Sequence, residues 1–120
     1  MSVDALALSA LTAEIREHLL GGRVQDVLAV DEWSVGFEVY AAGRRHYLLL
    51  SAHPQWARIH LSSVQLRRGL ETPPSLILLL RKRLRGGRLM EVTQPALERI
   101  VHLRFHHPQE GESLLVLECM

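Results

Sequence analysis

The chain of 120 residues contains 48% hydrophobic residues, with 14 Lys and Arg against 13 Asp and Glu, which gives a formal net charge of +1. A chain of this length folds as one domain, and its composition is typical of an ordinary packed interior, which excludes intrinsic disorder. The nearly neutral charge neither requires nor excludes a polyanionic partner.

The first residues differ from an export signal, because Asp4 stands where a signal peptide carries basic residues. The longest apolar runs are far shorter than a membrane span. We therefore expect a cytoplasmic protein without membrane contact. Cys119 is the single cysteine, so neither an internal disulfide nor a CxxC zinc pair is expected.

The first half of the chain predicts one helix followed by a three-stranded meander. Apolar residues recur every three or four positions over 3–20, which is the period of an amphipathic helix, and the glycine pair that follows ends it. Alternating and clustered apolar residues then predict strands over 24–30, 35–39 and 47–50.

The middle of the chain predicts a long loop and a second helix. The region 51–72 shows little periodicity, and we expect a loop there with a short strand over 58–61. Loops of this length inside a compact domain usually have a function. A helix is predicted over 75–84, because Pro73-Pro74 precede it and a second glycine pair follows it.

The two helix exits have similar sequences, because L-L-G-G-R-V-Q-D-V at 19–27 returns as L-R-G-G-R-L-M-E-V at 84–92, 65 residues later. Strand signals follow again over 98–105 and 114–117. We infer a duplicated helix-plus-three-strand unit. The expected fold class is α+β, with two half-sheets forming a β-sandwich or flattened barrel that has flanking helices. The glycines act as helix ends and not as a phosphate cradle, since a cradle needs a helix that starts after them.

A local basic patch coincides with the end of the second helix. Its members fall within eight positions: Arg81, Lys82, Arg83, Arg85 and Arg88. Cations at this place are favoured by the helix dipole alone. They also suit a salt-sensitive contact with phosphates. The density of the cluster favours a phosphate-binding edge.

The segment 51–60 combines a serine, two histidines and an arginine, which suggests a hydrolase. No GxSxG motif surrounds Ser51, and neither His53 nor His60 has an identifiable acid partner, so catalysis is not expected. His53 and Arg58 remain candidates for binding, because loops on rigid scaffolds often carry recognition residues.

Three histidines near the end of the chain raise the question of a metal site. On a strand, His102 and His106 share a face but lie about 13 Å apart, which is too far for one ion to bind both. Exposed edge or turn histidines are the expected interpretation, for His107 as well. We expect neither a metal nor a cofactor.

Several segments together resemble, in order, the NFACT-N domain. They are L-L-G-G-R-V at 19–24, L-L-L-S-A-H-P at 48–54, A-R-I-H-L at 57–61, Pro73-Pro74, L-L-R-K at 79–82, G-G-R at 86–88 and L-E-R-I-V at 97–101. The S-A-H-P loop followed by A-R-I-H is the specific part of this match. NFACT-N is the amino-terminal module of the RqcH and NEMF ribosome-quality-control family, also called fibronectin-binding protein A.

The resemblance implies that residues 1–120 are an NFACT-N domain, the amino-terminal fragment of a larger multidomain protein. It implies a non-catalytic domain that binds large ribosomal subunits carrying a stalled peptidyl-tRNA. It further implies recruitment of transfer RNA, alanine tRNA in bacteria, for carboxy-terminal tailing of nascent chains. In the bacterial family an Asp-Arg pair is associated with this recruitment, and Glu98-Arg99 stand at its place. The longer acid keeps the charge, and arginine can still bind phosphate or a base edge with its planar fork.

The NFACT-N domain is also similar in fold to the amino-terminal domain of formamidopyrimidine-type DNA glycosylases. Those enzymes use a proline and a glutamate after the initiator methionine, and Ser2 and Val3 stand there in this chain, so glycosylase chemistry is not expected. Two alternatives stay open beside the RNA-binding function: a glycosylase-like nucleic-acid-binding domain and a fibronectin-binding surface protein.

Overall fold

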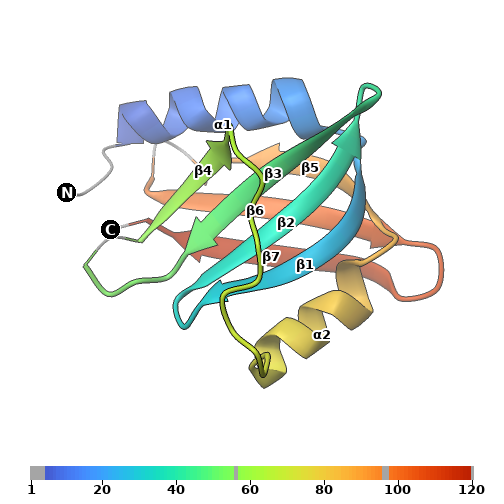
Figure 1. Cartoon of the computed structure of the whole chain (residues 1–120). Coiled ribbons are helices and arrows are strands. Elements are labelled where there is room, and N and C mark those ends of the chain that lie inside the picture. The colour runs from blue at the N-terminus through green and yellow to red at the C-terminus, as the bar shows by residue number, and fades with distance from the viewer. Residues whose placement is uncertain (1–4, 56, 96–97, 120) are drawn as a thin grey trace.

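The computed structural model describes residues 5–55, 57–95 and 98–119, which form an α+β fold of two helices and a seven-stranded antiparallel sheet (Figure 1). Along the chain the elements are α1 (Ala5–Leu19), β1 (Arg23–Asp31), β2 (Ser34–Ala41), β3 (Arg44–Ser51), β4 (Arg58–Ser62), α2 (Ser75–Leu84), β5 (Arg88–Thr93), β6 (Ile100–His107) and β7 (Gly111–Glu118). In the described part of the chain neither helix is long and apolar enough to cross a membrane.

Both predicted helices are present, and the first buries the apolar face that its spacing predicted. In α1 the buried side chains include Leu8, Ile15 and Leu19. Thr12 lies on the same face, where its hydroxyl donates a hydrogen bond to the Leu8 carbonyl oxygen at 2.7 Å. This bond satisfies the one polar group that the face takes into the core, so the whole face packs without an unpaired donor.

The sheet has the strand order β4-β3-β2-β1-β5-β6-β7 and folds over on itself. In a flat sheet β2 and β6 would lie about 14 Å apart, at about 4.8 Å per strand. The rings of Phe37 in β2 and Phe105 in β6 instead have centroids 6.0 Å apart. The two half-sheets therefore face each other across one core. The predicted sandwich is confirmed, with the addition that β1 pairs with β5 and joins the halves into one sheet.

The predicted duplication is visible in the hydrogen bonds that join the halves. Gly21 N donates to Leu89 O at 2.7 Å, and Gly86 N, 65 residues on, donates to Val24 O at 2.8 Å. Both glycines have positive φ, of 80° and 89°, so both helices end in the left-handed conformation that glycine adopts without a side-chain penalty. Equivalent residues meet reciprocally, which places an approximate twofold axis between the two exits. The first unit has one strand more than the second, β4.

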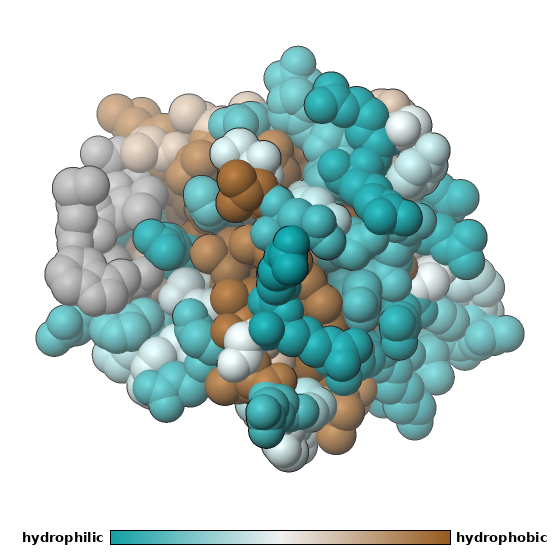
Figure 2. All heavy atoms as spheres, in the orientation of Figure 1, coloured by the Kyte–Doolittle hydropathy of each residue, from teal (hydrophilic) through white to brown (hydrophobic). Residues whose placement is uncertain are grey.

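The predicted loop between β3 and α2 contains the expected short strand, β4, and then a segment, residues 63–74, that we call the strap. The strap crosses the outer face of β1 and β2 (Figure 1). Gly69 N donates to Ala29 O at 2.9 Å. A Cβ atom on Gly69 would lie 1.8 Å from Val30 O, so only glycine permits this approach. Figure 2 shows hydrophilic atoms crossing the centre of this face with hydrophobic atoms on both sides.

The boundaries of the second half differ from the prediction at its last two strands. We expected a strand over 98–105, but β6 starts at Ile100, so Glu98 and Arg99 precede it. We expected 114–117 for the last strand, and β7 extends from Gly111 to Glu118. The first two residues of the predicted first helix, together with Ser2 and Leu97, lie outside the described residues. The expected likeness to glycosylases stays a prediction.

Candidate nucleic-acid interface

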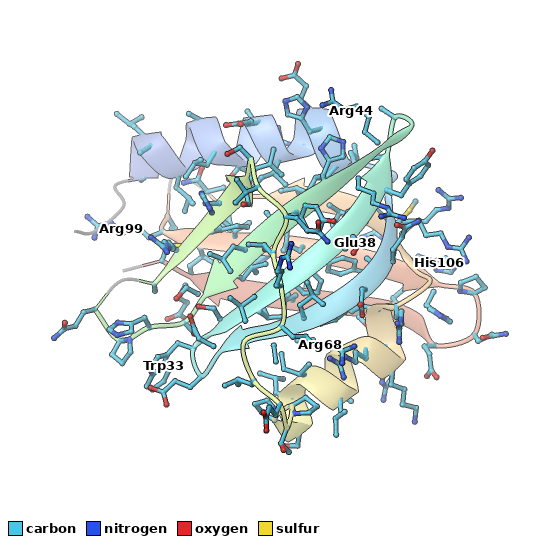
Figure 3. All side chains as sticks on the ribbon, in the orientation of Figure 1. Trp33, Glu38, Arg44, Arg68, Arg99 and His106 are labelled. Atoms are coloured by element: carbon cyan, nitrogen blue, oxygen red, sulfur yellow. The ribbon has the colours of Figure 1, made fainter. Side chains whose placement is uncertain are left out.

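The residues singled out from the sequence divide between two ends of the molecule. The end at the left of Figure 1, called here the loop end, contains the β1–β2 turn, the β3–β4 connection and the residues before β6. The opposite end, called the helix-exit end, contains both helix exits and the β2–β3 and β6–β7 turns. Figure 3 shows Trp33 and Arg99 at the loop end and His106 at the helix-exit end. The predicted binding residues therefore do not form one continuous site.

At the loop end, Glu98 and Arg99 are exposed on a backbone that is held firmly. Glu98 N donates to Pro95 O at 2.7 Å, and the Gln94 side-chain amide donates to Glu98 O at 2.7 Å. Arg99 O accepts a hydrogen bond from Cys119 N at 2.6 Å. Neither side chain forms an ion pair or a hydrogen bond with another described residue, and the two do not pair with each other. The backbone of the pair is therefore fixed, while both charged groups are open to a ligand.

His53 and Arg58 line a second feature of the loop end, a cavity of about 370 Å³. Its lining also includes Asp31, Glu32, Trp33 and Ser51. The Trp33 and His53 rings meet edge to face, with centroids 5.9 Å apart, and Trp33 is 44% exposed. The sequence analysis missed the two acids and the tryptophan, because the β1–β2 turn reaches this place through the pairing of β2 with β3.

The same cavity corrects one step of the sequence argument, since acids do lie near Ser51 and His53. The hydrogen bonds nevertheless differ from those of a catalytic triad. Ser51 Oγ accepts a hydrogen bond from the His53 backbone at 3.4 Å, and His53 Nδ1 accepts one from Gln55 N at 3.1 Å. A triad requires that Nδ1 donate to the acid, and an Nδ1 that accepts cannot do so.

At the helix-exit end, the basic cluster of α2 is partly used by the fold itself. The Arg81 Nε donates to Val27 O at 2.9 Å, which ties α2 to β1. Arg85 pairs with Asp26 at 3.5 Å, and its Nε donates to Gln25 O. Lys82 and Arg83 are exposed and have no ion pair or hydrogen bond from their side chains among residues 5–55, 57–95 and 98–119. These two are the cations of the cluster most available to a phosphate.

The histidines at this end form contacts within local structure, and His106 lies on β6, which is not an edge strand. His106 Nδ1 lies 2.6 Å from Glu112 Oε1, and Arg104 bridges Glu112 at 2.7 Å and Glu91 at 2.9 Å. The hydrogen bond with His106, and then that with Arg104, lowers the pKa of Glu112, and the two carboxylates raise the pKa of Arg104.

His107 holds the β6–β7 turn. Its Nδ1 accepts hydrogen bonds from Gln109 N and Glu110 N, both at 3.0 Å, so the proton lies on Nε2, which donates to Arg85 O. Across the described residues no three His, Cys, Asp or Glu side chains gather where they could hold a metal ion.

The family described as "NFACT N-terminal and middle domains" matches residues 4–120. The chain is 35% identical over 112 residues to the Rqc2 homolog RqcH of Bacillus subtilis, an alignment that covers 93% of this chain and 19% of that protein. It is 31% identical over 124 residues to the Rqc2 homolog RqcH of Streptococcus pneumoniae, with 100% of this chain and 22% of that protein covered. The chain thus spans about a fifth of the curated relatives it matches.

Two solved structures show the same fold over less than half of their own chains. The amino-terminal domain of the fibronectin-binding protein PavA from Streptococcus pneumoniae is 29% identical, with a TM-score of 0.90 over 98% of this chain and 45% of that one. The amino-terminal part of the fibronectin/fibrinogen-binding protein of Streptococcus suis is also 29% identical, with a TM-score of 0.91 over 99% of this chain and 46% of that one. On the family match, the relatives and the shared fold together, the chain belongs to the NFACT family.

Proposed function

We propose that this chain is the non-catalytic, RNA-binding amino-terminal domain of a cytoplasmic ribosome-associated quality-control factor. In this proposal the full protein binds large ribosomal subunits that carry a stalled peptidyl-tRNA. It recruits transfer RNA, alanine tRNA in bacteria, so that the nascent chain is extended at its carboxy terminus. Residues 1–120 would be followed by further domains, since the curated relatives are about five times as long.

The observation that carries the proposal is that Glu98 and Arg99, in a chain that belongs to this family, are exposed on a fixed backbone. The pair stands where the resemblance places the Asp-Arg pair associated with tRNA recruitment. Its backbone is fixed from both sides, while both side chains are exposed and unpaired within the described residues. A fixed backbone lowers the conformational entropy that this segment loses on binding, and a free guanidinium can bind a phosphate or base edge bidentately.

Other cations add electrostatic support. Lys82 and Arg83 are exposed and unengaged at one end, and Arg58 lies beside His53 at the other. Each phosphate that such a side chain neutralises releases condensed counterions, which makes binding salt-dependent. We assign Arg85 and Arg88 to the same role, with the qualification that both already form contacts within the fold.

The proposal is tested by binding of labelled alanine tRNA to the chain and to three variants. Arg99→Ala is expected to weaken binding by roughly five- to a hundredfold, because a lost arginine contact corresponds to about 1–3 kcal/mol. Glu98→Asp restores the acid of the family and is expected to bind at least as tightly as the unchanged chain. Arg67→Ala, which removes an exposed charge from the strap, is the control and should leave the affinity within about twofold. Equal losses for Arg99→Ala and Arg67→Ala would contradict a specific tRNA site.

The names of the two structural relatives support one alternative, a fibronectin-binding surface protein. It predicts that immobilised fibronectin retains the chain at physiological salt and that Arg99→Ala makes no difference to retention. Retention of tRNA without retention of fibronectin would exclude this alternative for the chain.

A further inference from the structure

An exposed row of side chains crosses the sheet at the helix-exit end. Its centre is the pairing of Arg23 in β1 with Arg88 in β5. The register continues it to Tyr40 in β2 and to His106 in β6. Residues directly opposite each other in neighbouring strands carry their side chains on the same face. Val24, Leu89, Val39 and Phe105, the neighbours of these four along their strands, are all buried, so the row lies on the outer face.

The centre of the row juxtaposes two like charges. Arginines directly opposite each other in an antiparallel pair destabilise the sheet. The Arg88 guanidinium donates to Gly21 O at 2.9 Å, and neither Arg88 nor Arg23 forms an ion pair with any residue that the structure describes. An anion bound between the two guanidinium groups would remove the repulsion.

On both flanks of the row, the basic side chains already contact a carboxylate. Arg45, which pairs with Tyr40 in the register, forms an ion pair with Glu38 at 3.5 Å. On the other side, His106 is engaged with Glu112. The uncompensated positive charge is therefore confined to the two central arginines. The right side of Figure 2, at this end of the molecule, is predominantly hydrophilic.

A hollow of about 360 Å³ lies beside the two arginines. Its lining includes Gly21 and Gly22, which follow α1, together with Arg23, Tyr40 and Arg88. Tyr40, the second-last residue of β2, is 45% exposed. Tyr40 and Arg88 lie two strands apart, so at about 4.8 Å per strand their backbones are about 10 Å from each other. An aromatic ring next to two unpaired arginines suits a ligand that has both a flat base and a phosphate.

We propose that this row binds one unpaired nucleotide of an RNA strand, with Arg23 and Arg88 on its phosphate and the Tyr40 ring stacked on its base. The inference rests on the proposed function in taking RNA as the ligand. It adds a second contact at the end opposite Glu98 and Arg99, which allows one RNA molecule to be held along the body of the domain. Base stacking on an aromatic side chain tolerates any sequence, since every base has a flat face.

The test uses three labelled probes of ten units each: a uridylate RNA, an abasic ribose-phosphate strand, and a peptide of glutamates. Tyr40→Leu is expected to weaken binding of the uridylate RNA by roughly five- to a hundredfold and to leave binding of the abasic strand unchanged. Arg23→Gln is expected to weaken both. The glutamate peptide is expected to bind much more weakly than the RNA.

A matched control separates this site from a general attraction. Arg68→Gln removes one exposed charge from the strap, outside both proposed sites, and should leave binding of the uridylate RNA unchanged. Because Arg23→Gln removes a like-charge contact, its thermal unfolding temperature is expected to equal or exceed that of the unchanged chain. An unfolding temperature that is not lowered excludes misfolding as the cause of weaker binding.

The inference is overturned if the uridylate RNA does not bind, if Tyr40→Leu binds it normally, or if the glutamate peptide binds as tightly as the RNA. Such results would leave the proposed function standing as long as Arg99→Ala still weakens tRNA binding. The expected losses in the Tyr40 and Arg23 variants, together with an unaffected Arg99→Ala variant, would instead contradict the assigned tRNA site and keep the row as a separate RNA contact.

Discussion

Cys119 follows β7 directly, and its side chain is fully buried. Burial raises the pKa of its thiol, because the charged thiolate is disfavoured away from water. Since the thiolate is the reactive form, we expect a maleimide to leave Cys119 unlabelled in the folded chain and to label it promptly in denaturant. The measurement is the mass of the protein after a timed exposure. Labelling of the native chain as fast as a small free thiol would contradict this placement, and with it the tight backbone contact between Cys119 and Arg99.

At the scale of single residues, the sequence shows which basic residues could bind a ligand, but not which of them form hydrogen bonds within the fold. Nothing in the order of residues indicates that Arg81 reaches Val27 O, because that contact depends on how α2 lies against β1. The duplication carried a usable signal, however. Arg16, 65 residues before Arg81, donates in the same way to Val92 O at 3.0 Å. An arginine repeated at equivalent positions of two units indicates a structural role in both.

This equivalence predicts different consequences for two neighbouring basic residues of α2. Arg81→Gln is expected to lower the free energy of unfolding by about 1 kcal/mol, because a partly buried carbonyl loses its donor. Lys82→Gln, which removes the same charge from an exposed position, should change it by less than about 0.5 kcal/mol. Lys82→Gln should in turn reduce the salt dependence of RNA binding. Chemical denaturation and a salt titration measure the two effects, and equal loss of stability in both variants would refute the division of roles.

At the scale of elements, the strap is the part whose role the sequence analysis left most open. Its length suggested a function, and the structure shows that it packs on β1 and β2. Gly69→Ala is expected to destabilise the fold by about 1–3 kcal/mol, since the new Cβ would overlap Val30 O and force the strap away. Gly43→Ala, where φ is 75° and the space is open, should lose only about 1 kcal/mol. Thermal or urea denaturation compares the two, and a smaller effect at Gly69 than at Gly43 would show that the strap is not closely packed.

The first helix and the second strand were predictable because each shows one clear periodicity, and the second helix because Pro73-Pro74 precede it and a glycine pair follows it. The start of β6 was misplaced by two residues, because neither glycine nor proline separates Glu98 and Arg99 from the strand that follows. The cavity that includes Trp33 and Asp31 could not be predicted, since it combines segments that meet only through strand pairing. The pairing of Arg23 with Arg88 was in principle accessible: equivalent residues next to a twofold axis meet each other.

At the scale of the whole molecule, the approximate twofold symmetry puts the helix exits at one end and the loops before β4 and β6 at the other (Figure 1). The cations proposed to bind RNA lie at both ends, and Arg99 and His106 lie on opposite sides of Figure 3. A ligand that contacts both must extend along the body of the domain, whose largest dimension is 34 Å. A folded RNA meets that requirement, whereas a single small molecule does not.

The most direct test of the central claim, that this domain binds transfer RNA as its ligand, is a competition experiment on bound, labelled alanine tRNA. The competitors are unlabelled tRNA, duplex DNA of equal charge, and fibronectin, each titrated at physiological salt. Specific binding of tRNA predicts that unlabelled tRNA displaces the label at concentrations at least about tenfold below those needed for duplex DNA, because recognition then exceeds the sequence-independent electrostatic contribution. It also predicts no displacement by fibronectin. Displacement by duplex DNA at the same concentration as tRNA, or displacement by fibronectin, would contradict it.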